Sequence, residues 1–369
     1  MALSGMLISF QPQIVEWAER DLRIVNPPGT GAPRLSLDAL VAKASEASPK
    51  GRPRAVTLNS DPAASIAVAF GKEGGNIYLD PYSGKALGGE SKAGLFLKKV
   101  ENWHRWFGSK KIGQPITGAA CLFFFFLLLS GLYLWWPRNR TRAGFRSAAT
   151  PIFKLKGKAR EWNWHTTVGL WAAPLLLVTT LTGTLIAYRW ANDFLFILTG
   201  NEPPPKPPEE GKRAGGKEGR KEGMPSRDAV PGASLDSLWA KAESQVPLWS
   251  SINLRFPQKP GGPFTAAIIE PGFSRRYARS MLTLNAATAE VIKWEPYSEQ
   301  NLGRRLRSWI VPVHTGRAVG APGQLAALLS ACAAALLIWT GASMAFRRFS
   351  KPNSRGKTRG NIGVTVNSE

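Results

Sequence analysis

Residues that bind metals or catalyse redox reactions are scarce in this chain. Cysteine occurs only at Cys121 and Cys332, each within an apolar run. Neither belongs to a CxxC or CxxCH motif, which excludes the usual cysteine-based zinc sites, dithiol redox catalysis and covalently attached haem. The turn at residues 71–75 is rich in glycine but carries no Walker or dinucleotide-binding fingerprint, so nucleotide binding has no support.

Acidic residues are also few, since 25 Asp and Glu stand against 48 Lys and Arg, for a net charge of +23. A basic surface of this size would be expected of a nucleic-acid-binding protein. The excess, however, is concentrated in short segments: residues 137–163 contain eight basic residues and one acid, and more basic residues follow Phe346. Short basic segments mark the cytoplasmic side of membrane proteins, so we expect no nucleic-acid partner.

Three long apolar runs are present, Ile116–Trp136, Val168–Tyr188 and Leu325–Phe346. Each would cover about 30 Å as a helix, which is the thickness of the hydrocarbon core of a bilayer. The polar stretches 30–103 and 191–313 lie between the runs and are predicted to face water on the side opposite the basic segments. A cleavable signal peptide is not predicted, because the first residues lack a basic region and a small-residue cleavage site.

The chain has three histidines, and each lies just ahead of one apolar run: His104, His165 and His314. A neutral imidazole offers a lone pair to iron, and haem in membrane helical bundles is usually held by such nitrogens on facing helices. This placement predicts a membrane haem protein. The alternative is that the histidines anchor loops at the membrane interface by hydrogen bonds, as neighbouring tryptophans would.

An internal duplication covers the polar stretches. Residues 36–44 recur as residues 234–242, with seven of nine positions identical. In each copy a Ser and an Asp at the start are typical of a capped helix. Alternating segments follow in both copies and predict a helix packed on a small antiparallel sheet. These expected strands are 54–59, 65–70 and 76–80 in the first copy, and 251–256, 264–269 and 281–285 in the second.

The membrane segments repeat as well. The interval from His104 to Gly131 is 27 residues, the same as from His314 to Gly341, and a Gly-Gln pair falls at the same offset in both. Leu3–Phe10 matches the outer end of the third span only, and we interpret it as a stub of the first helix. By this spacing the counterpart of His165 would precede Met1. We therefore expect an upstream coding segment with a fourth histidine.

Several motifs resemble one family. They are Gly131-Leu132-Tyr133-Leu134-Trp135-Trp136-Pro137-Arg138, His165-x-x-x-Gly169-Leu170-Trp171-Ala172-x-Pro174, His314-Thr315-Gly316, Gly320-x-Pro322-Gly323, and the hairpin Ile77-Tyr78-Leu79-Asp80-Pro81-Tyr82-Ser83-Gly84-Lys85. In this order they resemble the PepSY-associated transmembrane family, also called iron-regulated membrane proteins, some of which are ferric-siderophore reductases. One departure is Ala289, which stands where the family usually has Gly, and we expect a looser turn there.

The fold class expected from the residues and the resemblance is an α+β membrane protein. It comprises three full transmembrane helices, an N-terminal stub of a fourth and two small PepSY-like extracytoplasmic domains. The expected units are a helix remnant (1–12), the first PepSY-like domain (30–103), the second span (104–136), a basic cytoplasmic loop (137–163), the third span (164–190), the second PepSY-like domain (191–313) with a disordered linker (202–234), the fourth span (314–346) and a basic cytoplasmic tail (347–369).

The candidate cofactor ligands are assigned by side of the membrane. We expect His104 and His314 on the outer side, where they would share one haem iron. Glycines and prolines at Gly108, Gly113, Pro115, Gly316, Gly320 and Pro322 are expected to break the helices there and fold these segments back. His165 would lie on the inner side, with its partner histidine missing. It would hold haem alone or with the thioether of Met344, although Met344 also fits ordinary packing.

Basic residues crowd the outer ends of the second and fourth spans: Arg105, Lys110, Lys111, Arg304, Arg305, Arg307 and Arg317. They would pair with haem propionates or an anionic ferric chelate, or form a solvated rim near lipid headgroups.

The resemblance implies haem b, one or two per chain, and a bacterial inner-membrane oxidoreductase that passes electrons to ferric iron in a periplasmic siderophore. The expected donor is a quinol or a cytoplasmic reductase. The alternative is a non-catalytic anchored module that binds a peptide, protein or ligand.

Overall fold

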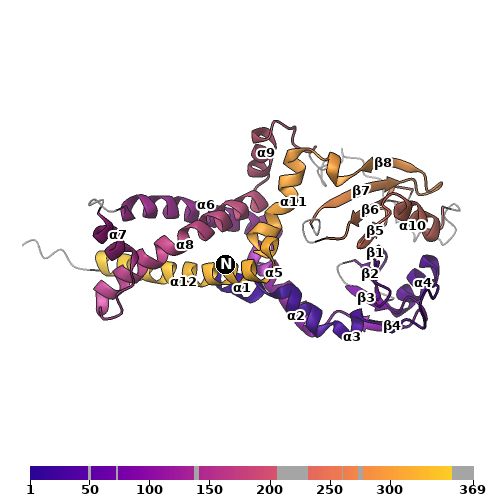
Figure 1. Ribbon diagram of the computed structural model, residues 1–369, viewed down its shortest axis with the longest axis horizontal. Helices are drawn as coiled ribbons and strands as arrows, with labels where there is room; N and C mark the ends of the chain where they lie inside the picture. Colours follow the sequence, from indigo (N-terminus) through magenta and orange to yellow (C-terminus); the bar gives the residue numbers. More distant parts are fainter. Residues whose placement is uncertain are drawn as a thin grey trace, which may run out of the picture.

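The computed structural model describes residues 1–48, 51–71, 74–136, 141–205, 232–259, 261–272 and 277–350. Long helices form an elongated bundle at one end, and all the strands lie at the other end (Figure 1). Most of the expected linker and most of the basic tail lie outside the described residues, so the prediction of a disordered linker is not tested.

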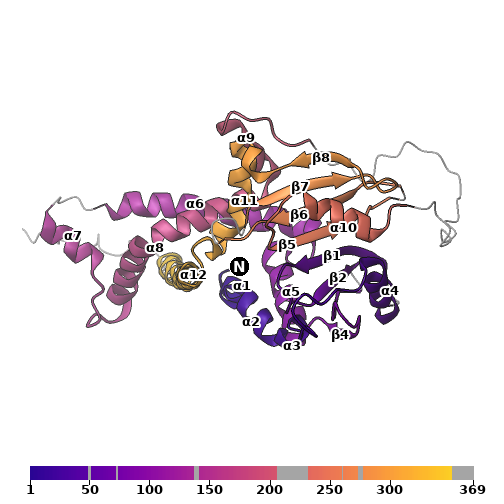
Figure 2. The same cartoon turned by 45° about the vertical axis from the view of Figure 1, so that its right-hand side comes forward.

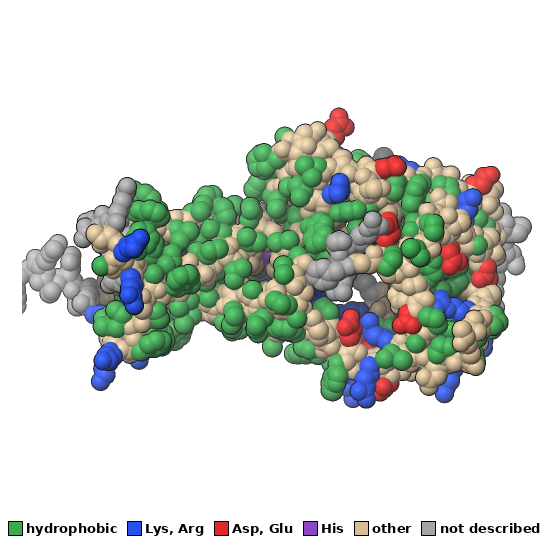
Figure 3. All heavy atoms as spheres, in the orientation of Figure 1, with side chains coloured by type: hydrophobic (Ala, Val, Ile, Leu, Met, Phe, Trp, Pro, Cys, Tyr) green, Lys and Arg blue, Asp and Glu red, His purple; other side chains and the backbone are tan. Residues whose placement is uncertain are grey.

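Within the described residues, three helices are long and apolar enough to cross a membrane: α6 (Lys110–Trp135), α8 (Gly157–Ala187) and α12 (Ala321–Phe349). They pack on one another through a small apolar core that includes Leu128, Leu176 and Leu337. Their outward faces are hydrophobic, and the space-filling view shows this surface along the bundle, with charged side chains gathered at its far end and over the sheet (Figure 3). The three predicted spans are therefore confirmed as apolar helices of sufficient length.

Shorter helices flank the long ones; α7 lies at the end of the bundle far from the sheet, and the others lie toward the sheet (Figure 1). The shorter helices are α1 (Ala2–Ile8), α2 (Gln11–Ala18), α3 (Arg20–Arg23), α5 (Lys92–Trp106), α7 (Arg142–Ala149), α9 (Arg189–Leu198) and α11 (Leu302–His314), with 3-10 turns η1 (Tyr297–Glu299) and η2 (Arg317–Val319). Of these, α5 leads into α6 and α11 leads into α12. The two histidines expected on the outer side lie near or at the ends of these two helices, His104 in α5 and His314 in α11.

Sharp corners separate α5 from α6 and α11 from α12. A Cβ atom on Gly113 would lie 1.6 Å from the carbonyl oxygen of Trp106, and one on Gly323 would lie 2.1 Å from that of Gly316. Only glycine permits such an approach of two backbones. The expectation that glycines fold these segments back agrees with this geometry, but Pro115 lies inside the continuous helix α6 and does not break it.

The strands form one antiparallel sheet in the order β4-β3-β2-β1-β5-β6-β7-β8, which runs through both duplicated halves (Figure 2). Helices α4 (Leu37–Ala47) and α10 (Leu235–Ser244) pack on it and share one hydrophobic core with it. The strands are β1 (Pro53–Asn59), β2 (Ile66–Phe70), β3 (Asn76–Leu79), β4 (Ala86–Gly89), β5 (Ser251–Arg255), β6 (Phe264–Ile269), β7 (Arg279–Leu284) and β8 (Val291–Glu295). The expectation of two separate small sheets is thus corrected.

The two halves join because β1 and β5 pair along their lengths, with Val56 opposite Leu254. The paired helices reinforce this join. Ser36 and Ser234 cap their own helices, as predicted. The acids act differently from the prediction: Asp236 accepts a hydrogen bond from the backbone N–H of Leu37 at 2.7 Å, and Asp38 accepts one from Leu235 at 3.0 Å. Each acid therefore caps the helix of the other half.

The turn between β7 and β8 has the same shape as its counterpart between β3 and β4. Ala289 adopts a φ of 56° and donates its N–H to the carbonyl of Asn285, while Gly84 adopts a φ of 70° and donates to Asp80. The expectation of a looser second turn is therefore corrected. An alanine in this left-handed conformation is strained by about 1 kcal/mol.

Replacing Ala289 by Gly should raise the free energy of unfolding by about 1 kcal/mol, because glycine adopts a positive φ without the steric penalty of a Cβ atom. Thermal unfolding of the detergent-solubilised protein measures the effect. The matched change in the other turn, Gly84→Ala, should lower stability, because its Cβ would also meet Lys43 at 2.5 Å. Equal stability of Ala289→Gly and the parent chain would show that the turn is not strained.

Candidate functional site

The rings of His104 and His314 face each other where the bundle meets the sheet. Their centroids are 6.5 Å apart, and the ring planes are inclined by 59°. A metal held between two imidazoles needs about 2 Å to each nitrogen and about 1.2 Å more to each ring centre, which is about 6.4 Å in all. The structure thus brings together the two histidines that were paired from sequence, at a separation that suits one metal. Ligation itself stays a prediction.

The ring of His104 rests on α1. Its Nδ1 atom lies 3.0 Å from the hydroxyl of Ser4. A Cβ on Gly5 would lie 3.4 Å from the ring carbon Cε1, so the ring sits directly over the helix backbone. Gln324 fixes the end of this short helix by donating to the carbonyl of Ser9 at 2.8 Å. The position of His104 therefore depends on both α5 and α1.

The ring of His314 rests on α8 in the same way. Its Nδ1 atom lies 3.0 Å from the hydroxyl of Thr182, and a Cβ on Gly183 would lie 3.3 Å from its Cε1 atom. Gln114 donates to the carbonyl of Ala187 at the end of this helix, at 2.5 Å. The helix α1 thus makes the same set of contacts as the outer end of α8, although its origin as a remnant of a fourth span stays a prediction.

His165 lies near the opposite end of the bundle, about 25 Å along α8 from Thr182 at the usual helical rise. Its Nδ1 atom is 2.7 Å from the hydroxyl of Thr340, and a Cβ on Gly341 would lie 3.4 Å from its Cε1 atom. His165 is therefore held like the outer pair but contributes to a separate site. Its role as a haem ligand, alone or with Met344, stays a prediction.

A cavity of about 630 Å³ surrounds the outer histidine pair and extends toward the sheet. This volume is within the usual range for small-molecule and cofactor sites. Its bundle end is lined by apolar side chains from three helices, including Phe124, Leu176 and Ile338. Its sheet end is polar and charged, with Glu19, Arg23, Tyr78, Glu90, Lys98, Glu101, Arg105 and Arg317. The cavity therefore suits an amphiphilic ligand with an apolar body and a polar edge.

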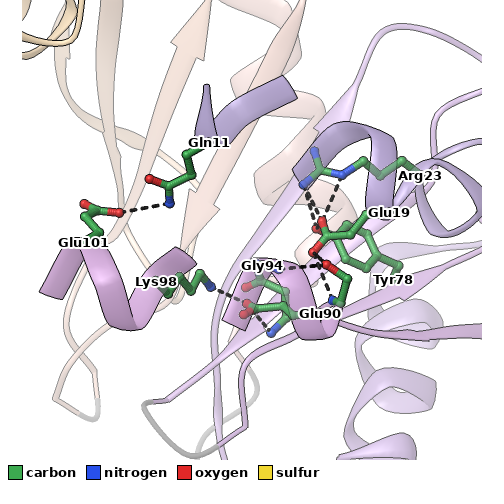
Figure 4. A network of polar contacts seen from close by, with 10 residues as sticks. Gln11, Glu19, Arg23, Tyr78, Glu90, Gly94, Lys98 and Glu101 are labelled. Atoms are coloured by element: carbon green, nitrogen blue, oxygen red, sulfur yellow. Dashed lines mark hydrogen bonds and ion pairs between the residues drawn. The ribbon is translucent and has the colours of Figure 1, made fainter. Parts of the chain in front are cut away.

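A buried network of hydrogen bonds forms the polar end (Figure 4). Glu19 is 2% exposed and accepts bonds from Arg23, from the hydroxyl of Tyr78 and from Ser91. Burial alone would raise the pKa of Glu19, but these bonds lower it overall. Burial, with Glu19 as acceptor, raises the pKa of Tyr78 to about 12, so the phenol stays protonated and the carboxylate charged. The network fixes the start of α5, and hence His104, against the sheet.

The basic residues singled out from sequence have different environments. Arg304 pairs with Glu295 at 2.6 Å, and Arg305 stacks on Tyr297. Arg105 pairs with Glu101 and lines the cavity. Lys110 and Lys111 border a second, shallower pocket beside α8.

Two other arginines of this set, Arg307 and Arg317, are partly buried. Burial and the neighbouring Arg105 lower the pKa of Arg307. Arg317 lines the cavity, and its buried Nε atom has no hydrogen-bond partner among the described residues. A buried guanidinium nitrogen without an acceptor is costly unless an anion binds there. A carboxylate of a bound cofactor would supply the acceptor that the buried Nε of Arg317 lacks, whereas a fully solvated rim would not bury this atom.

The residues present therefore fit a b-type haem at the outer site. Two imidazoles stand at the separation that a bis-histidine iron requires, the cavity wall is apolar beside them, and at the polar end the buried Nε of Arg317 lacks a hydrogen-bond partner among the described residues. Sequence analysis missed the pairing of each histidine with a hydroxyl and a glycine on another helix. The sequence does contain a pattern that indicates it. A Ser or Thr followed by Gly recurs in the four aligned helix segments, at Ser4-Gly5, Ser130-Gly131, Thr182-Gly183 and Thr340-Gly341.

The apolar helices and the α+β part together define a membrane protein with a domain outside the bilayer. The model of one family, described as the PepSY-associated TM region, matches residues 1–348. The chain belongs to this family, as its motifs indicated. No curated protein matches the chain in sequence.

Proposed function

We propose that this protein is a b-type haem oxidoreductase of the bacterial inner membrane, which passes electrons outward to ferric iron in a siderophore or similar chelate. One observation carries the proposal: the rings of His104 and His314 lie 6.5 Å apart at the apolar end of a cavity that opens toward the sheet. Imidazoles that face each other from two helices are the usual ligands of haem in helical bundles.

The residues of the outer site have separate tasks in this proposal. Haem iron supplies reversible one-electron transfer between its ferric and ferrous states. His104 and His314 would hold the iron, apolar side chains such as Phe124 and Leu176 would exclude water, and Arg317 would pair with a propionate. Each ferric ion of the chelate accepts one electron and becomes ferrous, which weakens its hold on hard oxygen ligands.

His165 would hold a second haem near the other end of the bundle, and so shorten the distance over which electrons must move. In this proposal that end, with α7 and the end of α12, faces the cytoplasm and the sheet faces the periplasm, because short basic segments are typical of the cytoplasmic side. A quinol or a cytoplasmic reductase would supply the electrons.

The test is to purify the full chain after expression with added haem and record its absorption spectrum. We expect a Soret band that shifts on reduction with dithionite, and re-oxidation of the reduced protein by a ferric chelate without oxygen. The gallium(III) complex of the same chelator is the matched control, because gallium(III) is not reducible under these conditions, and it should leave the protein reduced. A colourless preparation would overturn the proposal and favour a non-catalytic ligand-binding module.

A further inference from the structure

The three histidines share one arrangement of contacts, although they lie in different helices. Each Nδ1 atom is within 3.0 Å of a hydroxyl, and the ring lies over the glycine that follows this hydroxyl in sequence. We call this unit a hydroxyl–glycine pair. The pairs are Ser4-Gly5 for His104, Thr182-Gly183 for His314 and Thr340-Gly341 for His165.

The direction of the hydrogen bond follows from the other contact of each hydroxyl. Ser4 donates its proton to the carbonyl of Met1 at 2.9 Å. Thr182 and Thr340 donate to the carbonyls four residues earlier in their helices, at 2.7 and 2.8 Å. A hydroxyl has one proton, so its oxygen is left to accept a bond from the imidazole. For His314, Nδ1 also lies 3.0 Å from the carbonyl of Thr179, which can only accept, so Nδ1 carries the proton and Nε2 holds the free lone pair. With each hydroxyl proton directed at a carbonyl of its own helix, we assign the same tautomer to His104 and His165.

The glycine determines how close the ring can lie to the neighbouring helix. A side chain at Gly183 would begin 3.3 Å from the Cε1 atom of His314 and 2.9 Å from the sulfur of Cys121. A longer side chain would push the ring away from the hydroxyl. The hydroxyl and the glycine thus act together, one to fix the tautomer and the other to fix the ring position.

We propose that Ser4, Thr182 and Thr340 are positioning residues that present Nε2 of each histidine to a haem iron and strengthen it as a ligand. This inference rests on the proposed function. Partners that accept the second N–H of a ligating imidazole raise its basicity, and their loss typically weakens metal binding by about 10–100-fold. The effect should be similar for His104 and His314, because each ring also has a backbone carbonyl in reach, that of Met1 for His104 and that of Thr179, at 3.0 Å from Nδ1, for His314.

The test compares Ser4→Ala with Ser9→Ala. Both serines are buried and both donate to a carbonyl of their own helix, but only Ser4 contacts an imidazole in the described structure. Ser4→Ala should shift the midpoint potential of one haem to a more positive value, change its low-spin electron paramagnetic resonance signal and weaken haem binding by about 10-fold or more. Ser9 lines the cavity but contacts no imidazole in the described structure, so Ser9→Ala should leave the resonance signal unchanged, because this signal reports the ligands of the iron.

The conservative variant Ser4→Thr keeps the hydroxyl and should restore the potential and the resonance signal. Thr182→Val should shift the same haem by a similar amount. If the parent chain binds haem but Ser4→Ala and Ser9→Ala have the same potential and spectrum, the positioning role is wrong while the proposed function stands. If the parent chain binds no haem, the proposed function fails, and the positioning role fails with it.

Discussion

Replacing His104 by Ala, or His314 by Ala, should abolish the same low-spin haem signal. The two rings lie 6.5 Å apart, so each variant leaves one iron with a single protein ligand. The double variant should then lose no more haem than either single variant, because the two residues act as one unit. Haem stoichiometry from the pyridine haemochrome spectrum, together with electron paramagnetic resonance, measures the loss.

His165→Ala is the matched control for this experiment. Its ring contacts Thr340 on α12 and belongs to the other end of the bundle, so the outer low-spin signal should persist in this variant. Loss of different haems in the His104 and His314 variants would contradict a shared iron. Unchanged haem in both would leave the histidines as interface anchors.

The separation of the outer pair could be anticipated only in part from the sequence. Equal intervals from His104 to Gly131 and from His314 to Gly341 indicated duplicated helices and hence a symmetric pair. The intervals, however, compare positions along one continuous stretch of chain, from α5 to α6 or from α11 to α12. In the structure His104 contacts α1 and His314 contacts α8. Contacts between helices depend on how sharply the chain turns between them and on the angles at which they cross. Spacing along the sequence specifies neither.

The strands of the sheet could also be predicted only in part from the sequence. Alternating apolar residues predicted six of the eight strands within a few residues, because period-two burial is a local property. The short outer strands β4 and β8 were missed, since Ala86–Gly89 contains two glycines and Val291–Glu295 is mostly exposed or half-buried. The pairing of β1 with β5 was also missed. Both strands contain alternating buried residues, such as Val56 and Leu58 in β1 and Ile252 and Leu254 in β5, but alternation within a strand does not specify which strands pair.

Burial and pairing distinguish basic residues at the outer end that the sequence alone does not. From the sequence alone, Arg304 and Arg317 have the same expected role, because both are arginines near the outer end of a span. The structure separates them, since Arg304 is paired with Glu295 and the buried Nε of Arg317 has no partner among the described residues. Only the second lines the cavity, so Arg317 is the better candidate for binding a carboxylate of the cofactor.

Replacing Gly113 by Ala should disrupt the outer site without changing any side chain that lines it. The added Cβ would lie 1.6 Å from the carbonyl oxygen of Trp106, and neither backbone can move without opening the corner between α5 and α6. The corner is also held by the hydroxyl of Thr117, which donates to the carbonyl of Arg105 at 3.0 Å. We expect the free energy of unfolding to fall by about 3 kcal/mol or more, which is the upper end of the usual range for overpacked sites.

Gly131→Ala in the same helix is the matched control. A Cβ at Gly131 has no neighbour within 4 Å among the described residues, and alanine favours a helix over glycine by about 0.5–1 kcal/mol. The two substitutions should therefore change the thermal midpoint in opposite directions. Gly113→Ala should also lose the outer haem while His104 is still present, because opening the corner moves this ring away from His314. A Gly113→Ala protein as stable and as rich in haem as Gly131→Ala would show that the corner does not position the ligand.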